Sequence, residues 1–393
     1  MKGFIVVTGT EFVDGIKPEK NSLHIARESL QRGIEIIGIC KTPDDIYRIE
    51  QSIRYALDKA DIVFVTGGLG ATSDDLTREA IQEAIGVQLI YDKEWLEKLK
   101  KEKGKDITEK IKKLAKIPYG AVKIENPVGS AVGFLKVLEN KVIVALPGIP
   151  SELKAMLPIV FEKLNLKEKT KKIHIFRTFG LSEIEIDNLL SDIDNIYLNT
   201  TPKGVDIFLK AKNQETFQKK IETIKKRLNI YIYAEGNTEM EEVVGKLLKE
   251  HQKTISTAES STGGLIASRL INVPGSSSYV IGGIVAYSNE AKIEILKINP
   301  EHIQNYGAVS EIVAEQMAKG VKNLTKTDLA LSDTGIAGPT GGTKDKPIGL
   351  HYIGFATEKQ TKVYKEVFKG DRNDIRMQVS QYALNLVRLY LTK

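Results

Sequence analysis

At 393 residues the chain is too long for one ordinary hydrophobic core, and its length predicts two or three domains. Hydrophobic residues make up 41% and charged residues 27%, as in globular proteins, and no run of about 18 apolar residues is present to cross a membrane. The single cysteine, Cys40, excludes an internal disulfide and a cysteine zinc cluster. The net charge of +6 is mild and most lysines lie among glutamates, so no nucleic-acid partner is expected.

Strand-like and helix-like segments alternate through the first third of the chain. The opening MKGFIVVTGTEF has a strand pattern and lacks the features of a signal peptide, so a cytoplasmic location is expected. Short apolar runs predict strands at residues 4–8, 34–40, 61–68 and 141–148. Capping signals and apolar periodicity predict helices at residues 21–33, 44–60, 73–86 and 149–164. This alternation predicts a parallel sheet with helices on both faces.

Two polar segments, 165–172 and 235–241, mark predicted domain boundaries. Between them the pattern predicts a small α+β domain, with strand, helix, two strands, helix and strand at residues 174–180, 182–193, 196–201, 205–211, 215–228 and 230–234. Further strands are predicted at residues 253–258, 280–288, 328–335 and 348–357. The predicted architecture is α/β: two three-layer α/β/α domains, 1–168 and 238–393, joined by a small α+β middle domain, 169–237.

Loops rich in Gly, Ser, Thr and Asp follow several of the predicted strands. They read VTGTE, VTGGLGATSDD, ALPGIPSE, STAESSTGG and SDTGIAGPTGG. In open parallel sheets, ligands bind beyond the carboxyl ends of the strands. One such loop is explained by turn and cap chemistry alone, but several together predict ligand sites.

The stretch TAESSTGG, residues 257–264, carries groups that suit amide hydrolysis. Acyl transfer needs a nucleophile, a base, donors for the oxyanion and an acid for the leaving ammonia. Ser260 suits the nucleophile, and the N–H groups of the following TGG suit the oxyanion. Lys292 suits the base because a desolvated lysine can be uncharged, and Tyr287 suits a role in relaying or orienting its proton. The alternatives are a turn, an exposed helix lysine and a core tyrosine.

Other polar groups of the last third are assigned by type. The segment 334–342 contains glycines that permit close approach to a ribose or phosphate. Arg372 and Arg376 lie one helical turn apart and suit a 5′-phosphate, with surface salt bridges as the alternative. No Ser-His-Asp set is expected, and each histidine of this region is predicted to be a surface or packed residue: His251, His302 and His351.

Six blocks occur in order over residues 257–376: TAESSTGGLIASRL, VAYSNEAK, YGAVSE, TGIAGPTGG, KPIG and FKGDRNDIR. Together they resemble the CinA/PncC family of nicotinamide mononucleotide amidohydrolases, and the chain is similar to long-form CinA over essentially its whole length. The resemblance implies cofactor-free deamidation of nicotinamide mononucleotide to nicotinate mononucleotide and ammonia, catalysed by Ser260, Tyr287 and Lys292. The implied substrate-binding positions are Glu259, Ser261, Thr262, Gly263, Gly264, Asn289, Gly335, Gly338, Gly341, Gly342, Arg372 and Arg376.

Ser261 stands where many relatives have Cys. A thiol is therefore dispensable at this position, which favours the hydroxyl of Ser260 as the nucleophile and leaves that of Ser261 as the alternative.

Four N-terminal blocks, VTGTEFVDG with Asn21, TGGLGATSDDLT, NPVGSAVGF and LPGIPSE, resemble the molybdopterin-binding-like domain of the same family. In long members this domain is linked to metal-dependent ADP-ribose pyrophosphatase activity. The resemblance thus implies ADP-ribose or a pterin nucleotide as ligand and Mg²⁺ or a similar divalent cation as cofactor. A glycine loop can cradle a pyrophosphate, and carboxylates can hold a hard cation.

The expected metal ligands are Asp74, Asp75 and Glu11, with helix capping as the alternative for Asp74. The expected nucleotide-binding positions are Gly9, Thr10, Asn21, Gly67, Gly68, Gly70, Ser130, Pro147 and Gly148. The loops depart from the usual family pattern, which has Pro, Thr and Pro at the positions of Ala71, Ser130 and Val132.

The sequence thus predicts a two-activity hydrolase that acts on small nucleotides. The middle domain is expected to connect the two sites or to help form a homodimer. The alternative is a non-catalytic pterin- or nucleotide-binding scaffold associated with competence.

Overall fold

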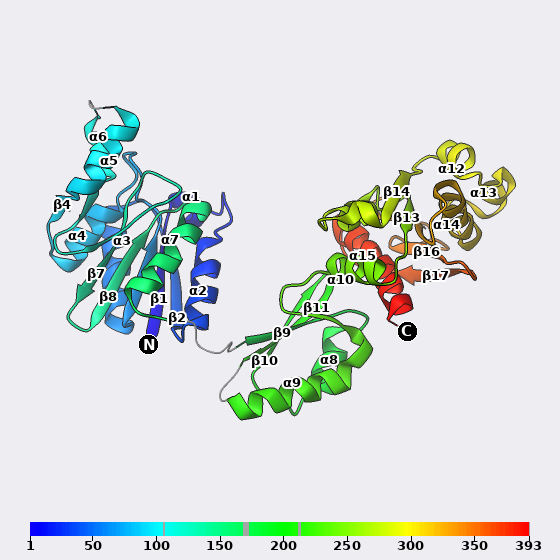
Figure 1. The fold of residues 1–393 in the computed structure, drawn as a ribbon, viewed down its shortest axis with the longest axis horizontal. Helices are drawn as coiled ribbons and strands as arrows, with labels where there is room; N and C mark the ends of the chain where they lie inside the picture. The colour runs from blue at the N-terminus through cyan, green and yellow to red at the C-terminus, as the bar shows by residue number, and fades with distance from the viewer. Residues whose placement is uncertain (105–106, 168–172, 211–213, 393) are drawn as a thin grey trace. The chain divides into compact units, whose positions relative to one another are not determined.

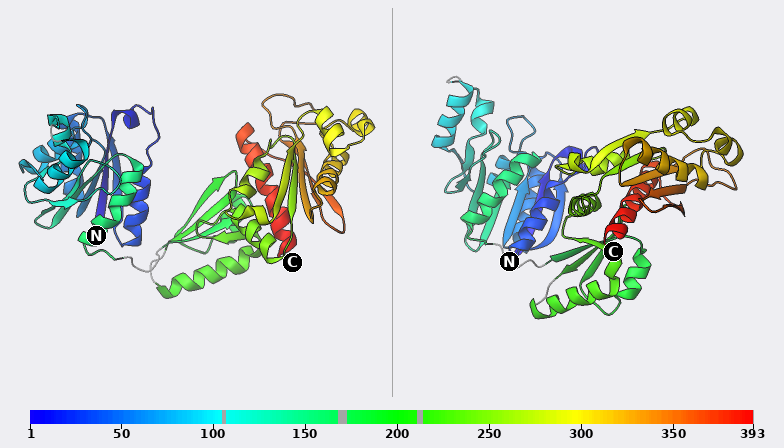
Figure 2. Two further views of the ribbon diagram at one scale, coloured as in Figure 1. Left: turned by 45° about the horizontal axis from the view of Figure 1, so that its top comes forward. Right: turned by 45° about the vertical axis from the view of Figure 1, so that its right-hand side comes forward.

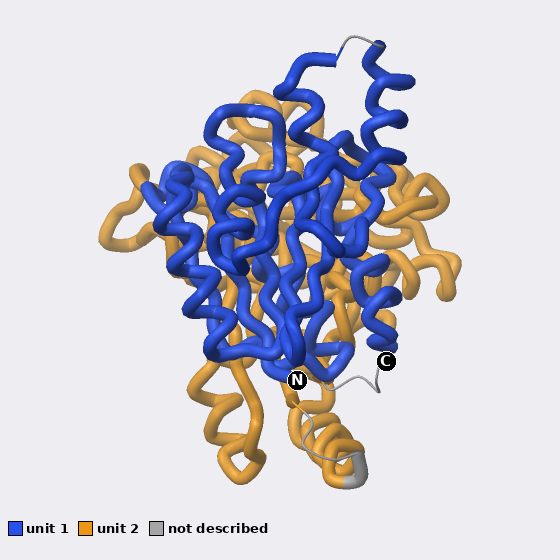
Figure 3. Tube along the Cα trace, turned by 90° about the vertical axis from the view of Figure 1, so that its left-hand side faces the viewer, with its two compact units in different colours: residues 1–172 blue, residues 173–393 orange. Residues whose placement is uncertain are grey.

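The computed structural model describes residues 1–104, 107–167, 173–210 and 214–392. The chain divides into two compact units, residues 1–172 (unit 1) and 173–393 (unit 2) (Figure 3). The boundary predicted between residues 168 and 169 lies outside the described residues. None of the described helices is both long and apolar enough to cross a membrane.

Unit 1 contains a six-stranded sheet of order β2-β1-β3-β8-β7-β6 (Figure 1). Its strands are β1 Lys2–Thr8, β2 Glu35–Thr42, β3 Ile62–Thr66, β6 Val122–Ile124, β7 Gly133–Leu138 and β8 Lys141–Leu146. The strands β2, β1, β3 and β8 pair in parallel, but β7 and β6 pair antiparallel. The four predicted strands thus pair in parallel as expected. The antiparallel strands β6 and β7 were not predicted, and short connections without a crossover helix join β6, β7 and β8.

Helices cover both faces of this sheet, so the predicted three-layer arrangement is confirmed. The core of one face includes α2 Asn21–Gln31 and α7 Pro150–Lys163. The core of the other includes α3 Ile46–Lys59, α4 Thr77–Ile85 and α5 Lys93–Lys103. Strand β3 is buried at every position, as expected of a strand covered on both faces. The remaining elements are α1 Thr10–Val13, α6 Glu109–Lys113, β4 Leu89–Tyr91 and β5 Lys116–Pro118.

Unit 2 begins with the small α+β arrangement that the sequence predicts. An antiparallel sheet of order β10-β11-β9-β12 is formed by β9 Ile173–Thr178, β10 Ile196–Thr201, β11 Gly204–Lys210 and β12 Ile232–Glu235. Its helices are α8 Glu183–Leu189, α9 Gln214–Leu228 and η1 Asn229–Tyr231. Arg388 Nη2 donates to the Ile230 carbonyl at 2.7 Å, so this part contacts the last helix of the same unit. A domain boundary at 237/238 stays a prediction.

The remainder of unit 2 contains a five-stranded sheet of order β14-β13-β15-β16-β17. The left view of Figure 2 shows helices on either side of this sheet, in the yellow to red part of the chain. Its strands are β13 Ile255–Glu259, β14 Val280–Val285, β15 Leu329–Gly335, β16 Leu350–Ala356 and β17 Thr361–Val367. Strands β14, β13 and β15 pair in parallel, whereas β16 pairs antiparallel with both β15 and β17. Because Gly335 pairs with His351, the start of β16 lies beside the carboxyl end of β15.

Helices again lie on both faces. One core includes α10 Met240–Glu250, α11 Leu265–Ile271 and α15 Arg372–Leu391, and the opposite core includes α12 Asn289–Leu296 and α14 Glu311–Thr325. Two short elements, η2 Ser276–Ser278 and α13 Pro300–Tyr306, complete the unit. The loop after β13 therefore lies at the sheet edge where the end of β15 and the start of β16 meet.

Candidate functional site

The loop after β13 is held by the buried carboxylate of Asp333 on β15. Asp333 accepts backbone N–H bonds from Ser260 at 3.1 Å, Ser261 at 3.0 Å and Thr262 at 3.3 Å. A carboxylate that accepts several backbone N–H groups fixes the conformation of a turn strongly. Asp333 therefore sets the position of both serines.

The N–H groups left for a substrate lie just beyond this turn. The sequence predicted that the N–H groups of the TGG segment face an oxyanion, but that of Thr262 is occupied by Asp333. Within the described part of the chain, the N–H groups of Gly263 and Gly264 have no protein acceptor. Both glycines have positive φ, 60° and 90°, a conformation that glycine adopts without strain. Their expected role as oxyanion donors stays a prediction.

Ser260 and Lys292 are brought into direct contact. The Nζ of Lys292 lies 3.1 Å from Ser260 Oγ and donates to the carbonyls of Ala286 at 2.8 Å and Tyr287 at 3.1 Å. The Lys292 side chain is only 1% exposed. Burial lowers the pKa of Lys292, and the charge of Asp333 opposes this effect. The pair has the spacing required of a nucleophile and its base.

Tyr287 reaches this pair through its backbone rather than through its ring. Its side chain is 66% exposed, and its hydroxyl lies 3.4 Å from Arg372 Nη2. Arg372 also donates to the Gly338 carbonyl at 2.7 Å. In the described contacts, no hydrogen bond joins the Tyr287 hydroxyl to Lys292, and Arg372 is not a cause of the lowered pKa of Lys292. The expected proton-relay role of Tyr287 therefore has no direct contact in support.

Arg376, one turn further along α15, contacts the site loop itself. Its Nη2 donates to the Thr262 carbonyl at 2.7 Å, so α15 helps to hold the loop from the outside. Asn289 is exposed at the start of α12. Arg376 was expected to bind phosphate, and its position beside the glycines of the loop keeps that role available.

Glu259 was expected to bind substrate, but its carboxylate is fully buried and engaged by the protein. It accepts bonds from Thr262 Oγ1 at 2.7 Å, from the Ile266 N–H at 3.0 Å and from the Ala267 N–H at 2.8 Å. Burial raises the pKa of Glu259. Its position therefore favours a role at the start of α11 rather than in substrate contact.

His351, like Asp333, is a residue of this site whose place the sequence reasoning missed. It is packed, as predicted, but it is fully buried against the site, with Nε2 2.8 Å from Ser261 Oγ and Nδ1 2.9 Å from the Gly349 carbonyl. Ser261 Oγ is also hydrogen-bonded to Asp333 Oδ2 at 2.6 Å. Burial lowers the pKa of His351. The wiring differs from a Ser-His-Asp triad, because the carboxylate contacts the serine and not the imidazole.

The glycines of the 334–342 loop are needed partly for packing. A Cβ on Gly335 would lie 2.1 Å from the His351 ring. A Cβ on Gly338 or Gly342 would lie 2.8 Å from the Ile348 side chain. Gly341 has φ 87°, and a Cβ there would lie 3.9 Å from the Ile336 side chain, an ordinary contact distance. The loop therefore owes several of its glycines to close contacts within the protein.

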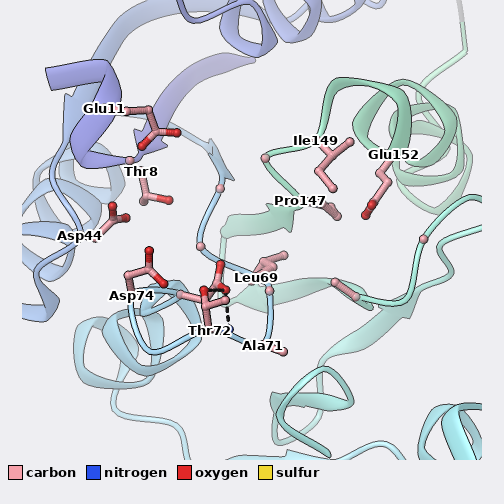
Figure 4. A pocket seen from close by; sticks show the side chains of 18 of the residues that line it. Thr8, Glu11, Asp44, Leu69, Ala71, Thr72, Asp74, Pro147, Ile149 and Glu152 are labelled. Carbon is pink, nitrogen blue, oxygen red and sulfur yellow. Dashed lines mark hydrogen bonds between the residues drawn. The ribbon is translucent and has the colours of Figure 1, made fainter. Parts of the chain in front are cut away.

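Unit 1 carries a separate cavity of about 740 Å³ at the carboxyl ends of its parallel strands (Figure 4). Figure 4 shows Glu11, Asp44 and Asp74 on one side of it and Glu152 on the other. The predicted residues that line it are Gly9, Glu11, Gly67, Gly68, Gly70, Asp74, Asp75, Ser130, Pro147 and Gly148. The sequence reasoning did not select Lys17, Asp44 or Glu152, although Glu152 is the last residue of the LPGIPSE block.

Thr10 and Asn21 do not line the cavity themselves but bond to residues that do. Asn21 is buried and donates to Thr66 Oγ1 at 3.1 Å and to the Gly148 carbonyl at 2.8 Å, so it joins two cavity loops. Thr10 donates its N–H to Asp44 at 2.8 Å. These contacts fix the shape of the cavity.

The two predicted aspartate ligands differ in their surroundings. Helix α4 begins at Thr77, later than predicted, so Asp74 and Asp75 lie in the turn before it. Asp75 accepts the Thr72 N–H at 2.8 Å and closes this turn. Asp74 is exposed, and a hydrogen bond from Thr72 lowers its pKa. Among the described residues, no three His, Cys, Asp or Glu side chains are grouped closely enough to hold a metal by themselves.

Comparison with known proteins covers both units. The family described as "Probable molybdopterin binding domain" matches residues 4–166, and that described as "CinA C-terminal domain" matches residues 237–391. A CinA-like protein of Sulfurihydrogenibium sp. (strain YO3AOP1) is 57% identical, covering 100% of this chain and 99% of that protein. A CinA-like protein of Thermotoga maritima is 36% identical, covering 99% and 98%. The crystal structure of a CinA protein with unknown function from Thermoplasma acidophilum is 34% identical, with a TM-score of 0.40, covering 41% of this chain and 96% of that one.

Proposed function

The chain belongs to the CinA family in its long form, and on this premise we propose that its C-terminal site hydrolyses the carboxamide of nicotinamide mononucleotide. The observation that carries this proposal is the 3.1 Å contact between Ser260 Oγ and the Nζ of buried Lys292. Burial disfavours the ammonium form of Lys292, and an uncharged amine can accept the serine proton.

The reaction proceeds in two halves. Ser260 Oγ attacks the carboxamide carbon and passes its proton to Lys292, and the N–H groups of Gly263 and Gly264 stabilise the oxyanion. The carbon–nitrogen bond then breaks while Lys292 returns the proton to the nitrogen. Ammonia departs, and the acyl group remains bound to Ser260 as an ester. Water gives a proton to Lys292 and attacks the ester. The bond to Ser260 breaks, Ser260 Oγ regains the proton, and nicotinate mononucleotide is released.

The surroundings of the pair suit a positively charged pyridinium nucleotide. The exposed Tyr287 ring offers a face to the cationic nicotinamide ring. Arg372 and Arg376 supply guanidinium groups at the same end of α15, and each already donates to a loop carbonyl of the site. These groups suit the 5′-phosphate.

The direct test is product formation by the full chain. Incubation with nicotinamide mononucleotide is expected to yield ammonia and nicotinate mononucleotide in equal amounts, without an added metal. Nicotinamide riboside, which lacks the phosphate, is expected to be a poorer substrate through a higher KM. A folded protein that binds the mononucleotide and releases no ammonia would contradict hydrolysis and favour the binding-scaffold alternative.

A second proposed activity, cleavage of a nucleotide pyrophosphate such as ADP-ribose, rests on the cavity of unit 1. Glycine-rich loops and carboxylates line one cavity large enough for a nucleotide. Mg²⁺ commonly uses one or two carboxylates together with substrate phosphates, which fits the few free acidic groups here better than a metal cage. Glu11 and Asp74 would hold the cation, which would neutralise phosphate charge when bound. Cleavage of ADP-ribose that is unchanged by a chelator would contradict the metal requirement.

A further inference from the structure

Ser261 links two titratable residues in a buried hydrogen-bonded chain. Asp333 Oδ2 lies 2.6 Å from Ser261 Oγ, and Ser261 Oγ lies 2.8 Å from His351 Nε2. His351 Nδ1 lies 2.9 Å from the Gly349 carbonyl. All three side chains are less than 10% exposed, so solvent does not complete these contacts.

Counting the protons in these hydrogen bonds determines the total charge of Asp333, Ser261 and His351. The three contacts from Asp333 through Ser261 and His351 to the Gly349 carbonyl need one proton each. A carboxylate, a serine hydroxyl and a neutral imidazole together supply only two. The carbonyl accepts only from a protonated Nδ1, so the contact left without a proton would set two lone pairs against each other in a buried place.

One additional proton satisfies every contact. It resides on Asp333 Oδ2 or on His351 Nε2, and the Ser261 hydroxyl reorients between the two arrangements. Either arrangement gives the three residues a total charge of zero, which is also the charge that burial favours.

The charge of Asp333 matters because of its neighbour. The charge of Asp333 opposes the effect of burial on the pKa of Lys292. It also fixes the N–H groups of Ser260 and Ser261. With a total charge of zero, the three hydrogen-bonded residues would hold Ser260 in place without stabilising the ammonium form of Lys292.

We propose that Asp333, Ser261 and His351 form a proton-sharing unit of zero net charge, in which Asp333 and His351 are positioning residues that fix the Ser260 loop and keep Lys292 uncharged. The existence of the unit is independent of the substrate, and only its catalytic consequence rests on the proposed function. The other titratable or charged groups of the elements that form the site are not substituted in the tests that follow: Glu259 on β13, Glu290 on α12, Tyr287 before α12, and Arg372 and Arg376 on α15.

The unit is tested without substrate by nitrogen NMR of the full chain labelled with [¹⁵N]histidine. The chain has five histidines, and the His351 signals are those absent from His351→Gln. In the wild type, Nδ1 should be protonated and neither nitrogen should titrate between about pH 6 and pH 8, where a free histidine does. Ser261→Ala should change the Nε2 signal. A His351 that titrates normally, or identical signals in wild type and Ser261→Ala, would overturn the unit.

Its consequence is tested by the pH dependence of turnover. In His351→Gln, the amide still donates to Ser261 Oγ but supplies no titratable proton, so Asp333 keeps its full negative charge. The acid limb of kcat should move to higher pH by about one pH unit, because a charge a few ångströms away stabilises the ammonium form of Lys292. A lower kcat with an unmoved limb would reduce His351 to a packing residue.

His302→Gln is the matched control. His302 lies on α13, where its Nδ1 is 2.7 Å from Gln316 Nε2, and none of its described hydrogen bonds is to the Ser260 loop. The acid limb of kcat in His302→Gln should lie at the same pH as in the wild type. If the wild type releases no ammonia, the proposed function fails, while the NMR measurement still decides whether the unit exists.

Discussion

Replacing Lys292 tests whether this residue is a base or a binding group. A lysine that titrated near 10.4 would be uncharged in only about one molecule in 2,500 at pH 7. Burial at 1% exposure lowers the pKa of Lys292 and raises that fraction. Lys292→Ala removes the proton acceptor 3.1 Å from Ser260 Oγ, and loss of a general base typically costs about 10²–10⁴-fold in turnover.

Lys292→Arg should be nearly as damaging, because a guanidinium stays protonated. Size also disfavours arginine there, since acceptors surround Nζ at 2.8–3.1 Å. Chemical rescue separates the two causes. Methylamine added to Lys292→Ala should restore part of the turnover, in proportion to its uncharged fraction, whereas guanidinium should not.

The assay is ammonia release at saturating nicotinamide mononucleotide, measured across pH for each variant. Folding is checked by thermal unfolding, since the substitution empties a buried position. If Lys292→Arg keeps most of the wild-type turnover, or if guanidinium rescues Lys292→Ala as well as methylamine does, Lys292 is a binding residue and the base lies elsewhere.

Three further outcomes are expected. Tyr287→Phe should keep most of kcat, because Lys292 contacts the Tyr287 carbonyl; a kcat loss as large as that of Lys292→Ala would show that the hydroxyl transfers the proton. Asp75→Ala should lower the unfolding free energy by about 1–2 kcal/mol, because the turn contact with the Thr72 N–H is lost. Asp74→Asn should instead weaken Mg²⁺-dependent ADP-ribose cleavage without destabilising the protein. The reverse pattern would exchange the roles of the two aspartates. The pKa of Lys292 is lowered in the folded state, so the unfolded state binds more protons between that pKa and 10.5. The unfolding free energy of the wild type should therefore rise with pH in this window, and denaturant titrations of Lys292→Met should lack this rise. An equal rise in both proteins would contradict a lowered pKa of Lys292.

Much of the fold follows from local patterns in the sequence. The apolar runs at residues 4–8 and 61–68 become β1 and β3, because central strands of a covered sheet are buried on both faces. The antiparallel strands β7 and β16 were not foreseen as such. Strand direction depends on which neighbour a segment pairs with, and a single strand's apolar pattern carries no record of that partner.

The residues of the candidate site likewise fall into those that the sequence could predict and those that it could not. Ser260 and Lys292 could be proposed together because each lies in a motif whose chemistry fits its residue type. Asp333 and His351 could not, since an aspartate and a histidine inside strands have many ordinary explanations. Their roles arise from the pairing of β15 with β16, which places both beside the serine loop. That register is a tertiary property.

The central claim is that Ser260 is the nucleophile of an amide hydrolysis, and the most direct measurement compares Ser260→Ala with Ser261→Ala. Ammonia release from nicotinamide mononucleotide is measured for both folded variants beside the wild type. Ser260→Ala should release none above the uncatalysed rate, because no hydroxyl then faces Lys292. Ser261→Ala should release less than the wild type but a measurable amount. Ammonia release that persists in Ser260→Ala and stops in Ser261→Ala would contradict the assignment of Ser260.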